Sequence, residues 1–272
     1  MRISRISGDV NELIAEGLSL AKLDKNKEAI SLFDRALKLN PQNVDAFYNK
    51  GLVLIKIGKN REAISYFEKI LEKDPQHVAA LNNKGNALAE LGHYEEALSY
   101  YDKALEFQPN YVAAIYNKAI TENKHGKYNE SITLLDRALE IEPQNISTLF
   151  YKGLVLGKQK KHEDALYCFD KLLKVEQKNI EAMFYKGTEL AELGRYPDAI
   201  FAFDEFLKEQ PKNGNVIYAK SRAKAQLGEY DEALILLAEA ISYHGRTIKN
   251  WAIRDIAFKN LKDDHRFRTI VK

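Results

Sequence analysis

The sequence predicts an all-α fold of antiparallel helical hairpins, and three observations carry this prediction. Five of the six prolines lie on one 34-residue register, in which Gln177 stands at the step missing between the last two. Apolar residues recur at the spacing of amphipathic helices, and a glycine returns between two such helices in most periods of the register. No insertion or deletion breaks the register from residue 10 to residue 247, so the chain is a repeat protein. The prolines on the register are Pro41, Pro75, Pro109, Pro143 and Pro211.

The register divides the chain into seven repeats, which follow a short N-terminal lead of residues 1–9. In each repeat, the first helix is expected to end at the glycine, where the backbone needs a left-handed φ. Asp24 and Lys160 take the place of this glycine in the first and fifth repeats. The second helix is expected to end before the proline, which has no N–H to donate. The predicted repeats are 10–43, 44–77, 78–111, 112–145, 146–179, 180–213 and 214–247.

Two further positions of the repeat carry small side chains, and a third carries an aromatic or leucine side chain. In the second repeat these are Gly51 on the first helix, and Ala63 and Phe67 on the second. Small residues let the helices approach closely, and the large residue fills the adjoining space. This order of small, aromatic and proline positions closely resembles the tetratricopeptide repeat (TPR). The Lys-Gly pair in most repeats also resembles TPR arrays of archaea. The resemblance implies a right-handed α-α superhelix, or solenoid, whose first helices line a concave surface.

Residues 248–272 are predicted to form a C-terminal capping helix and tail, because an end hairpin has no neighbour to cover it. Trp251, Arg254 and Phe258 occupy first-helix core positions of a truncated eighth repeat. We favour this cap over the alternative, in which the C-terminal segment is a tail that binds a partner.

Six successive first helices carry a lysine at a position that the family usually fills with a buried leucine. An unpaired ammonium on the core side of a helix is costly, so each lysine needs an acid. An acidic residue recurs on the second helices, sixteen residues before each lysine. We therefore predict a ladder of ion pairs between repeats, which serves register and stability rather than ligand binding. The expected pairs are Asp34 with Lys50, Glu68 with Lys84, Asp102 with Lys118, Asp136 with Lys152, Asp170 with Lys186, and Asp204 with Lys220.

The solvent-facing side of the first helices is the candidate binding groove. Asparagine can donate and accept hydrogen bonds, so a row of asparagines can hold the backbone of an extended peptide; the alternative is that asparagine is simply common at this place in the family. Aromatic side chains dominate from the fourth repeat onward and are typical interface anchors, although some could instead pack against neighbouring first helices. The candidate residues are Asn49, Asn82, Asn83, Asn86, Asn117, Asn123, Tyr48, Tyr116, Phe150, Tyr151, Phe184, Tyr185, Tyr218 and Arg222.

Composition excludes several other classes of function. The 41 basic and 39 acidic residues nearly balance, so no strong field favours nucleic acid or an anionic membrane. The single cysteine cannot form an internal disulfide, and we find neither a signal peptide nor a membrane-spanning stretch, so a soluble cytoplasmic protein is expected. Phosphate-loop, zinc-protease and paired C-x-x-C motifs are missing, so we expect no enzyme, no cofactor and no metal.

These observations predict a non-catalytic scaffold that binds an extended or helical segment of a protein partner in the groove. The alternative is a structural array that self-associates into a homo-oligomer through the groove or the terminal helix. RNA binding would need a basic groove, which the mixed groove charges do not provide.

Overall fold

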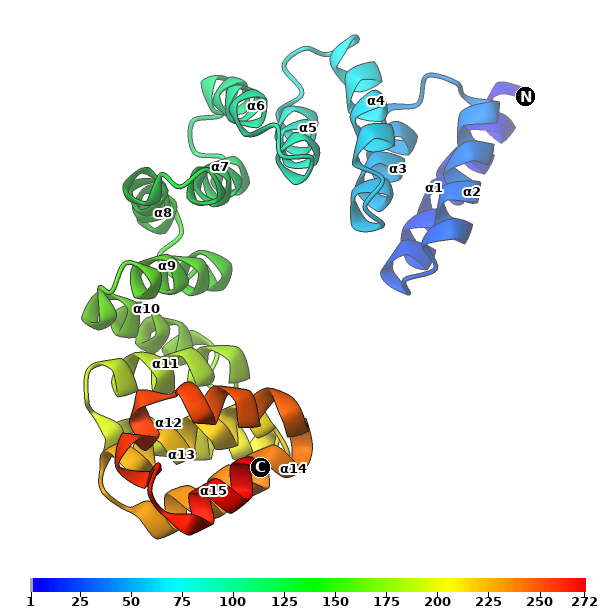
Figure 1. Ribbon diagram of the computed structural model, residues 1–272. Coiled ribbons are helices and arrows are strands. Elements are labelled where there is room, and N and C mark those ends of the chain that lie inside the picture. Colours follow the sequence, from blue (N-terminus) through cyan, green and yellow to red (C-terminus); the bar gives the residue numbers. More distant parts are fainter. Residues whose placement is uncertain (1) are drawn as a thin grey trace. The chain divides into compact units, whose positions relative to one another are not determined.

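Helices alone make up the secondary structure of the part of the chain that the computed structural model describes, residues 2–272, with side chains from residue 10 onward. They alternate as the first and second helices of antiparallel hairpins, so the predicted all-α class is confirmed (Figure 1). The hairpins are α1 (Arg2–Lys22) with α2 (Asn26–Leu39), α3 (Val44–Lys56) with α4 (Asn60–Leu71), α5 (Val78–Glu90) with α6 (Tyr94–Phe107), α7 (Val112–Lys124) with α8 (Tyr128–Ile141), α9 (Ile146–Lys158) with α10 (His162–Val175), α11 (Ile180–Glu192) with α12 (Tyr196–Glu209), and α13 (Gly214–Gln226) with α14 (Tyr230–Arg254). A 3-10 helix η1 (Ile256–Leu261) and α15 (His265–Val271) follow.

The chain forms two compact units, Met1–Glu142 and Pro143–Lys272. Within each unit the second helix of one hairpin packs on the first helix of the next, as α4 packs on α5 and α12 on α13. Neighbouring first helices also contact each other: α3 contacts α5, and α11 contacts α13. Within each unit, a hairpin with a neighbour on both sides is therefore covered on both faces, which is how hairpins that cannot bury their own apolar faces share a core.

Local sequence signals account for where the helices begin and end. The predicted left-handed turn after each first helix is confirmed, with φ of 84° at Gly92 and a positive φ even at Asp24 and Lys160, which replace the glycine. At the start of most first helices an asparagine side chain accepts a hydrogen bond from a free N–H of the first turn, as Asn43 does from Ala46 at 2.8 Å. These caps and turns fix the length of each hairpin.

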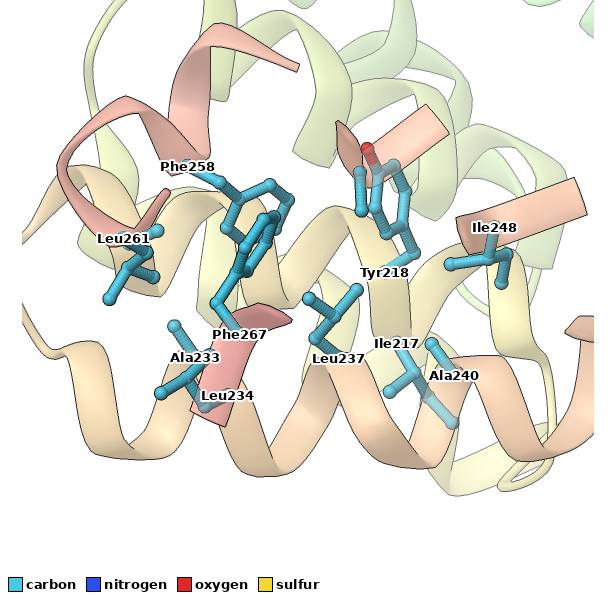
Figure 2. Close-up of a cluster of buried hydrophobic side chains, with 12 residues drawn as sticks. Ile217, Tyr218, Ala233, Leu234, Leu237, Ala240, Ile248, Phe258, Leu261 and Phe267 are labelled. Atoms are coloured by element: carbon cyan, nitrogen blue, oxygen red, sulfur yellow. The ribbon is translucent and has the colours of Figure 1, made fainter. Parts of the chain in front are cut away.

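The C-terminal segment closes the second unit over α13 and α14. Gly245 breaks α14 with φ 43°, and the chain then turns through η1 into α15. Phe258 lies between two other rings of the cluster (Figure 2): its ring centroid is 5.7 Å from that of Phe267 and 6.0 Å from that of Tyr218. Of the three residues expected at core positions, Phe258 is fully buried, but the expectation is wrong for Trp251, which is 47% exposed, and for Arg254, which is also exposed; the fully buried Ile248 belongs to the cluster instead.

The ion-pair ladder forms between successive hairpins as predicted. Lys84 Nζ lies 2.8 Å from Glu68, Lys118 2.5 Å from Asp102, Lys186 2.7 Å from Asp170 and Lys220 2.5 Å from Asp204, and Lys50 pairs with Asp34. The pair Asp136 with Lys152 would join the two units and stays a prediction.

Tyrosines of the following second helix support the first two lysines of the ladder. The Lys84 ammonium lies 4.4 Å from the centroid of the Tyr100 ring, and Lys50 donates to the Tyr66 hydroxyl at 2.7 Å. Burial lowers the pKa of Lys84, but hydrogen bonds with Glu68 and Tyr100 outweigh it and leave the pKa above its ordinary value. The lysine therefore stays charged in a position that is only 7% exposed.

We expect the Glu68–Lys84 pair to contribute about 1 kcal/mol or less to stability, because the Glu68 carboxylate is half-exposed and screened by water. A double-mutant cycle with Glu68→Gln and Lys84→Met measures the coupling energy. The pair Lys59 with Glu62, in which both side chains are exposed, is the control and should give a smaller value. A coupling above about 2 kcal/mol would contradict the small contribution expected of a half-exposed pair.

Candidate functional site

The candidate site lies on the first-helix face, defined as the solvent-facing side of α3, α5 and α7 in the first unit and of α9, α11 and α13 in the second. We describe the two parts separately. The first part carries the predicted asparagines, and the second carries most of the predicted aromatic residues.

In the first unit, the asparagine side chains bond to neighbouring first helices. Asn117 Nδ2 donates to Asn82 Oδ1 at 3.0 Å, and Asn83 Nδ2 donates to the Tyr48 hydroxyl at 3.0 Å. Asn82 and Asn83 are only 4% and 9% exposed, so the expectation that they lie on the solvent-facing surface is wrong for these two residues. Both bonds join residues 35 positions apart, so each links one hairpin to the next. Several of the amides are therefore already engaged in holding successive repeats together.

Other predicted residues of the first unit also have partners within the protein. Asn49 Nδ2 donates to the Asp45 carbonyl of its own helix at 2.8 Å. Asn86 Oδ1 accepts from the buried Tyr101 hydroxyl at 2.8 Å, and burial raises the pKa of Tyr101 to about 12. Tyr116 and Asn123 are half-buried. A peptide on this face would use the remaining hydrogen-bonding capacity of amides that are fixed by these bonds.

In the second unit, the same inter-repeat positions carry aromatic rings. Phe150 and Tyr185 are 35 residues apart, like the pairs of the first unit, and their rings meet edge to face at 5.5 Å. Tyr185 also stacks on Phe169 at 5.8 Å, and Phe184 contacts Phe206 at 6.2 Å. Tyr151 is half-buried. Packing between neighbouring helices therefore accounts for part of the aromatic surface. This agrees with the alternative stated above, in which some aromatic side chains pack against neighbouring first helices.

The aromatic rings do not close the surface completely. A pocket of about 280 Å³ opens between α9, α11 and α13. Apolar side chains form its wall, and the exposed Glu181 and Asn215 stand among its polar residues. Its lining is Phe150, Glu181, Phe184, Tyr185, Phe206, Asn213, Asn215 and Val216. A pocket with aromatic walls and a few polar groups suits one apolar side chain of a ligand, which the polar groups would orient.

Tyr218 and Arg222 are held by the C-terminal segment. The Tyr218 hydroxyl donates to Asp255 Oδ2 at 2.7 Å, and Arg222 Nε lies 2.6 Å from the same oxygen. Burial, followed by the hydrogen bond to Asp255, raises the pKa of Tyr218 well above its ordinary value. Both residues thus fasten the cap to α13, a contact that sequence reasoning missed because it projected the helices of the seven full repeats only, up to residue 247.

Of the pocket lining, the candidate residues included only Phe150, Phe184 and Tyr185; among those missed are Phe206, Asn213, Asn215 and Val216. Asn213 is the N-cap of α13 and Phe206 lies on the second helix α12, so neither falls on the projected first-helix surface. One feature of the sequence could have pointed to the pocket: Val216 stands at a repeat position where most repeats carry the smaller alanine.

We also looked for polar clusters that could form a catalytic or metal-binding site. His162 Nδ1 lies 2.7 Å from the buried Glu189 carboxylate, at a site where Gly157 leaves room for that carboxylate. From residue 10 onward, no group of three His, Cys, Asp or Glu side chains is placed to hold a metal ion. None of the described helices combines the length and the apolar character that a membrane crossing requires.

Comparisons with known families agree with the helical architecture. Two models described as tetratricopeptide repeat match residues 48–112 and 88–152, and a third, described as TPR repeat, matches residues 17–58. A model of anaphase-promoting complex, cyclosome, subunit 3 matches residues 124–205 and 158–240. The matches follow one another without a gap from residue 17 to residue 240. Among curated proteins, none matches the chain significantly.

Solved structures of low sequence identity share the fold. The structure of YrrB, described as a TPR protein with an unusual peptide-binding site, is 24% identical over 70% of this chain and 98% of its own, with a TM-score of 0.61. A tetratricopeptide repeat protein from Parabacteroides merdae is 18% identical over 89% and 97%, with a TM-score of 0.61. PilW, a type IV pilus biogenesis factor, is 23% identical over 74% and 94%, with a TM-score of 0.67.

Proposed function

The chain belongs to the tetratricopeptide repeat family, whose members serve as protein–protein interaction scaffolds, and from this premise we propose that its first-helix face binds a segment of a protein partner without catalysis. The seven repeats and their capping segment supply the frame, and the variable positions of the first helices supply the contacts. The asparagines of the first unit contact the backbone of the partner. The aromatic residues of the second unit hold an apolar anchor.

The observation that carries this proposal is the pocket of about 280 Å³ in the second unit. A preformed pocket costs no reorganisation when a side chain enters it, and aromatic walls provide large contact area at little loss of entropy. Glu181 at the pocket favours a basic group beside the apolar anchor. The YrrB structure is described as having a peptide-binding site, which makes peptide recognition a reasonable use of this fold.

Two further expectations accompany the proposal. Self-association is the alternative use of the first-helix face, and light scattering over a range of concentrations separates the two, because a monomer leaves the face free for another protein. A cytoplasmic location stays a prediction.

We expect Asn215→Tyr to weaken partner binding at least tenfold, because a large side chain at this exposed position fills the mouth of the pocket. Affinity capture from a native lysate with the immobilised chain identifies the partner, and titration of the purified partner measures the loss. Asn83→Ala combined with Asn117→Ala should weaken binding less, because both amides already donate to neighbouring helices.

The matched control is Asn11→Tyr, an exposed asparagine at the same repeat position on α1, outside the second unit. All variants must keep the helical circular dichroism of the parent. Equal partner binding by Asn215→Tyr and the parent would overturn the pocket as the anchor site, and an unchanged Asn83/Asn117 variant would remove the asparagines from the contact surface.

A further inference from the structure

We propose that a cleft between α2 and α4 of the first unit binds an acidic segment of a protein partner, in which carboxylates flank an apolar side chain. This basic cleft has a volume of about 570 Å³. Second helices supply most of its lining, whereas the proposed pocket of the second unit is lined chiefly by first helices. The side chains that define the basic cleft are Leu37, Lys38, Phe47, Tyr66, Lys69 and Lys73.

The wall of the basic cleft is apolar and already in place. Phe47 of α3 is only 5% exposed, and Leu37 and Tyr66 are half-buried. The rings of Phe47 and Tyr66 adjoin, with their centroids 6.0 Å apart. A wall of this kind accepts an apolar side chain without having to rearrange.

Three lysines bring positive charge to this wall. The Lys69 ammonium lies over both rings, 5.4 Å from the centroid of Phe47 and 4.9 Å from that of Tyr66. Lys73 donates to the backbone carbonyl of Gln42 at 2.7 Å, and Lys38 is exposed. Contacts with a ring or a carbonyl leave the charge of a lysine uncompensated. Among the side chains described from residue 10 onward, none of the three lysines has an acid as an ion-pair partner.

The acids of the basic cleft do not cancel these charges. Asp34 lines the cleft, but its carboxylate pairs with Lys50 of the ladder. The other acid of the lining is the exposed Glu72. Three lysines therefore stand against one remaining carboxylate, which is an excess of two positive charges. Charge complementarity favours a ligand that carries carboxylates.

A second cleft of the same build lies one repeat later, between α4 and α6. Its volume is about 580 Å³. The Lys103 ammonium lies 5.0 Å from the centroid of the Tyr100 ring, as Lys69 lies over Tyr66. Leu81 takes the place of Phe47 in the wall. The packing of successive hairpins therefore produces the cleft in both places.

The charges of the second cleft have the opposite sign. Glu68 and Lys84 of its lining neutralise each other in the ladder. Its remaining charges are those of Lys103, Glu72 and Glu106, an excess of one negative charge, and Glu72 lines both clefts. Because the build recurs and the charge does not, the positive charge is a feature of one cleft and not a by-product of the repeat.

The open form of the basic cleft favours a peptide over a small anion. Six of its ten lining residues are exposed. Sites for small molecules enclose about 70–90% of the ligand surface, which an open cleft does not do. A peptide gains further contacts by running beyond the cleft along the helices. Nucleic acids and anionic membranes are attracted by extended positive fields, whereas this chain has a net charge of only +2.

The test uses three fluorescent peptides of roughly ten residues, centred on Glu-Phe-Glu, Lys-Phe-Lys and Glu-Ser-Glu. Fluorescence anisotropy with the full-length chain should show binding of the Glu-Phe-Glu peptide and not of the Lys-Phe-Lys peptide. The Glu-Ser-Glu peptide should bind at least about tenfold more weakly, because it has no side chain for the apolar wall.

Lys38→Glu with Lys73→Phe should weaken binding of the Glu-Phe-Glu peptide by more than about tenfold. This variant gives the basic cleft the residues of the second cleft, since Glu72 and Phe107 stand at the same repeat positions. It should keep the helical circular dichroism of the parent, because the next hairpins already carry these residues.

The matched control is Lys27→Glu with Lys25→Phe, which changes the net charge by the same amount at exposed positions around the start of α2. This control and Asn215→Tyr should both leave binding of the Glu-Phe-Glu peptide unchanged, which separates the basic cleft from general attraction and from the proposed pocket. Equal binding of the acidic and basic peptides, or full binding by the Lys38/Lys73 variant, would overturn the proposal. Binding of anionic vesicles in preference to the peptide, lost in the Lys38/Lys73 variant, would also overturn it.

Discussion

Truncation of Phe67 to alanine is expected to lower the free energy of unfolding by about 3–5 kcal/mol. The Phe67 ring is fully buried between α3 and α4. Its removal leaves a cavity that the opposite helix cannot fill, because Gly51 faces the ring and has no side chain. Urea unfolding followed by circular dichroism measures the loss. Hydrogen exchange on α3 and α4 locates it, because a repeat array need not unfold in a single step.

Replacing Gly51 with a larger residue is expected to overpack the same contact, whereas Phe67→Ala leaves it underpacked. A Cβ atom on Gly51 would lie 2.7 Å from Cζ of Phe67, so the ring or the helices must move. Overpacking of this kind costs about 1–3 kcal/mol. Alanine is a better helix former than glycine by about 1 kcal/mol, so Gly51→Ala should cost up to about 2 kcal/mol in total. Adding Phe67→Leu should relieve the clash, so the double variant should be more stable than the sum of the single effects predicts.

Ser65→Ala, on the exposed side of the same second helix, is the control and should change stability by no more than about 0.5 kcal/mol. If Phe67→Ala were no more harmful than Ser65→Ala, the small and aromatic positions of the repeat would not be the packing frame of the hairpin.

The packing of the small and aromatic positions within each hairpin was predictable from the sequence because these positions recur in every repeat. Gly51 and Phe67 lie in one hairpin, and their counterparts recur at the same spacing, so a helical projection brings them together. The ladder was also predictable, because pairing inside a repeat would place Glu16 opposite Asp34 and Lys220 opposite Ala238, whereas pairing between repeats gives each of the six lysines an acid. Lys84 therefore meets Glu68 of the preceding hairpin, as the sixteen-residue spacing required.

The first-helix face was harder to predict because its contacts depend on how successive hairpins stack. A projection of one helix places Tyr48 and Asn83 on the solvent side of their respective helices. The hydrogen bond between them forms only because α3 and α5 lie next to each other with a particular offset. The same offset brings Phe150 to Tyr185 and leaves the pocket beside them. Asp255 was not found at all, because it follows the break in α14 at Gly245, beyond which the helical projection of the repeats no longer describes the chain.

Removal of the Asp255 carboxylate is expected to cost about 2–4 kcal/mol and to release the C-terminal segment. One carboxylate serves three groups: the Tyr218 hydroxyl at 2.7 Å, the Arg222 guanidinium at 2.6 Å and the backbone N–H of Ala257 at 2.9 Å. The Asp255 side chain is only 11% exposed, so Asp255→Ala would leave the buried Tyr218 hydroxyl without an acceptor. A hydrogen bond to a charged group is worth about 1.5–3 kcal/mol, and loss of a helix cap adds about 1 kcal/mol. The exposure of Arg222 keeps the total below the cost of breaking a fully buried pair.

The site of the damage distinguishes this variant from a general loss of stability. Faster hydrogen exchange should be confined to η1, α15 and the part of α14 beyond Gly245, because Tyr218 and Phe258 join these elements to α13. Asp263→Ala is the control, since the Asp263 side chain is fully exposed and its pair with Arg268 should contribute little. Asp255→Asn keeps one acceptor oxygen but loses the charge that holds Arg222, so it should fall between the parent and Asp255→Ala. Protection factors equal to those of the parent across residues 255–271 in Asp255→Ala would mean that apolar packing of Phe258 and Phe267 alone holds the cap in place.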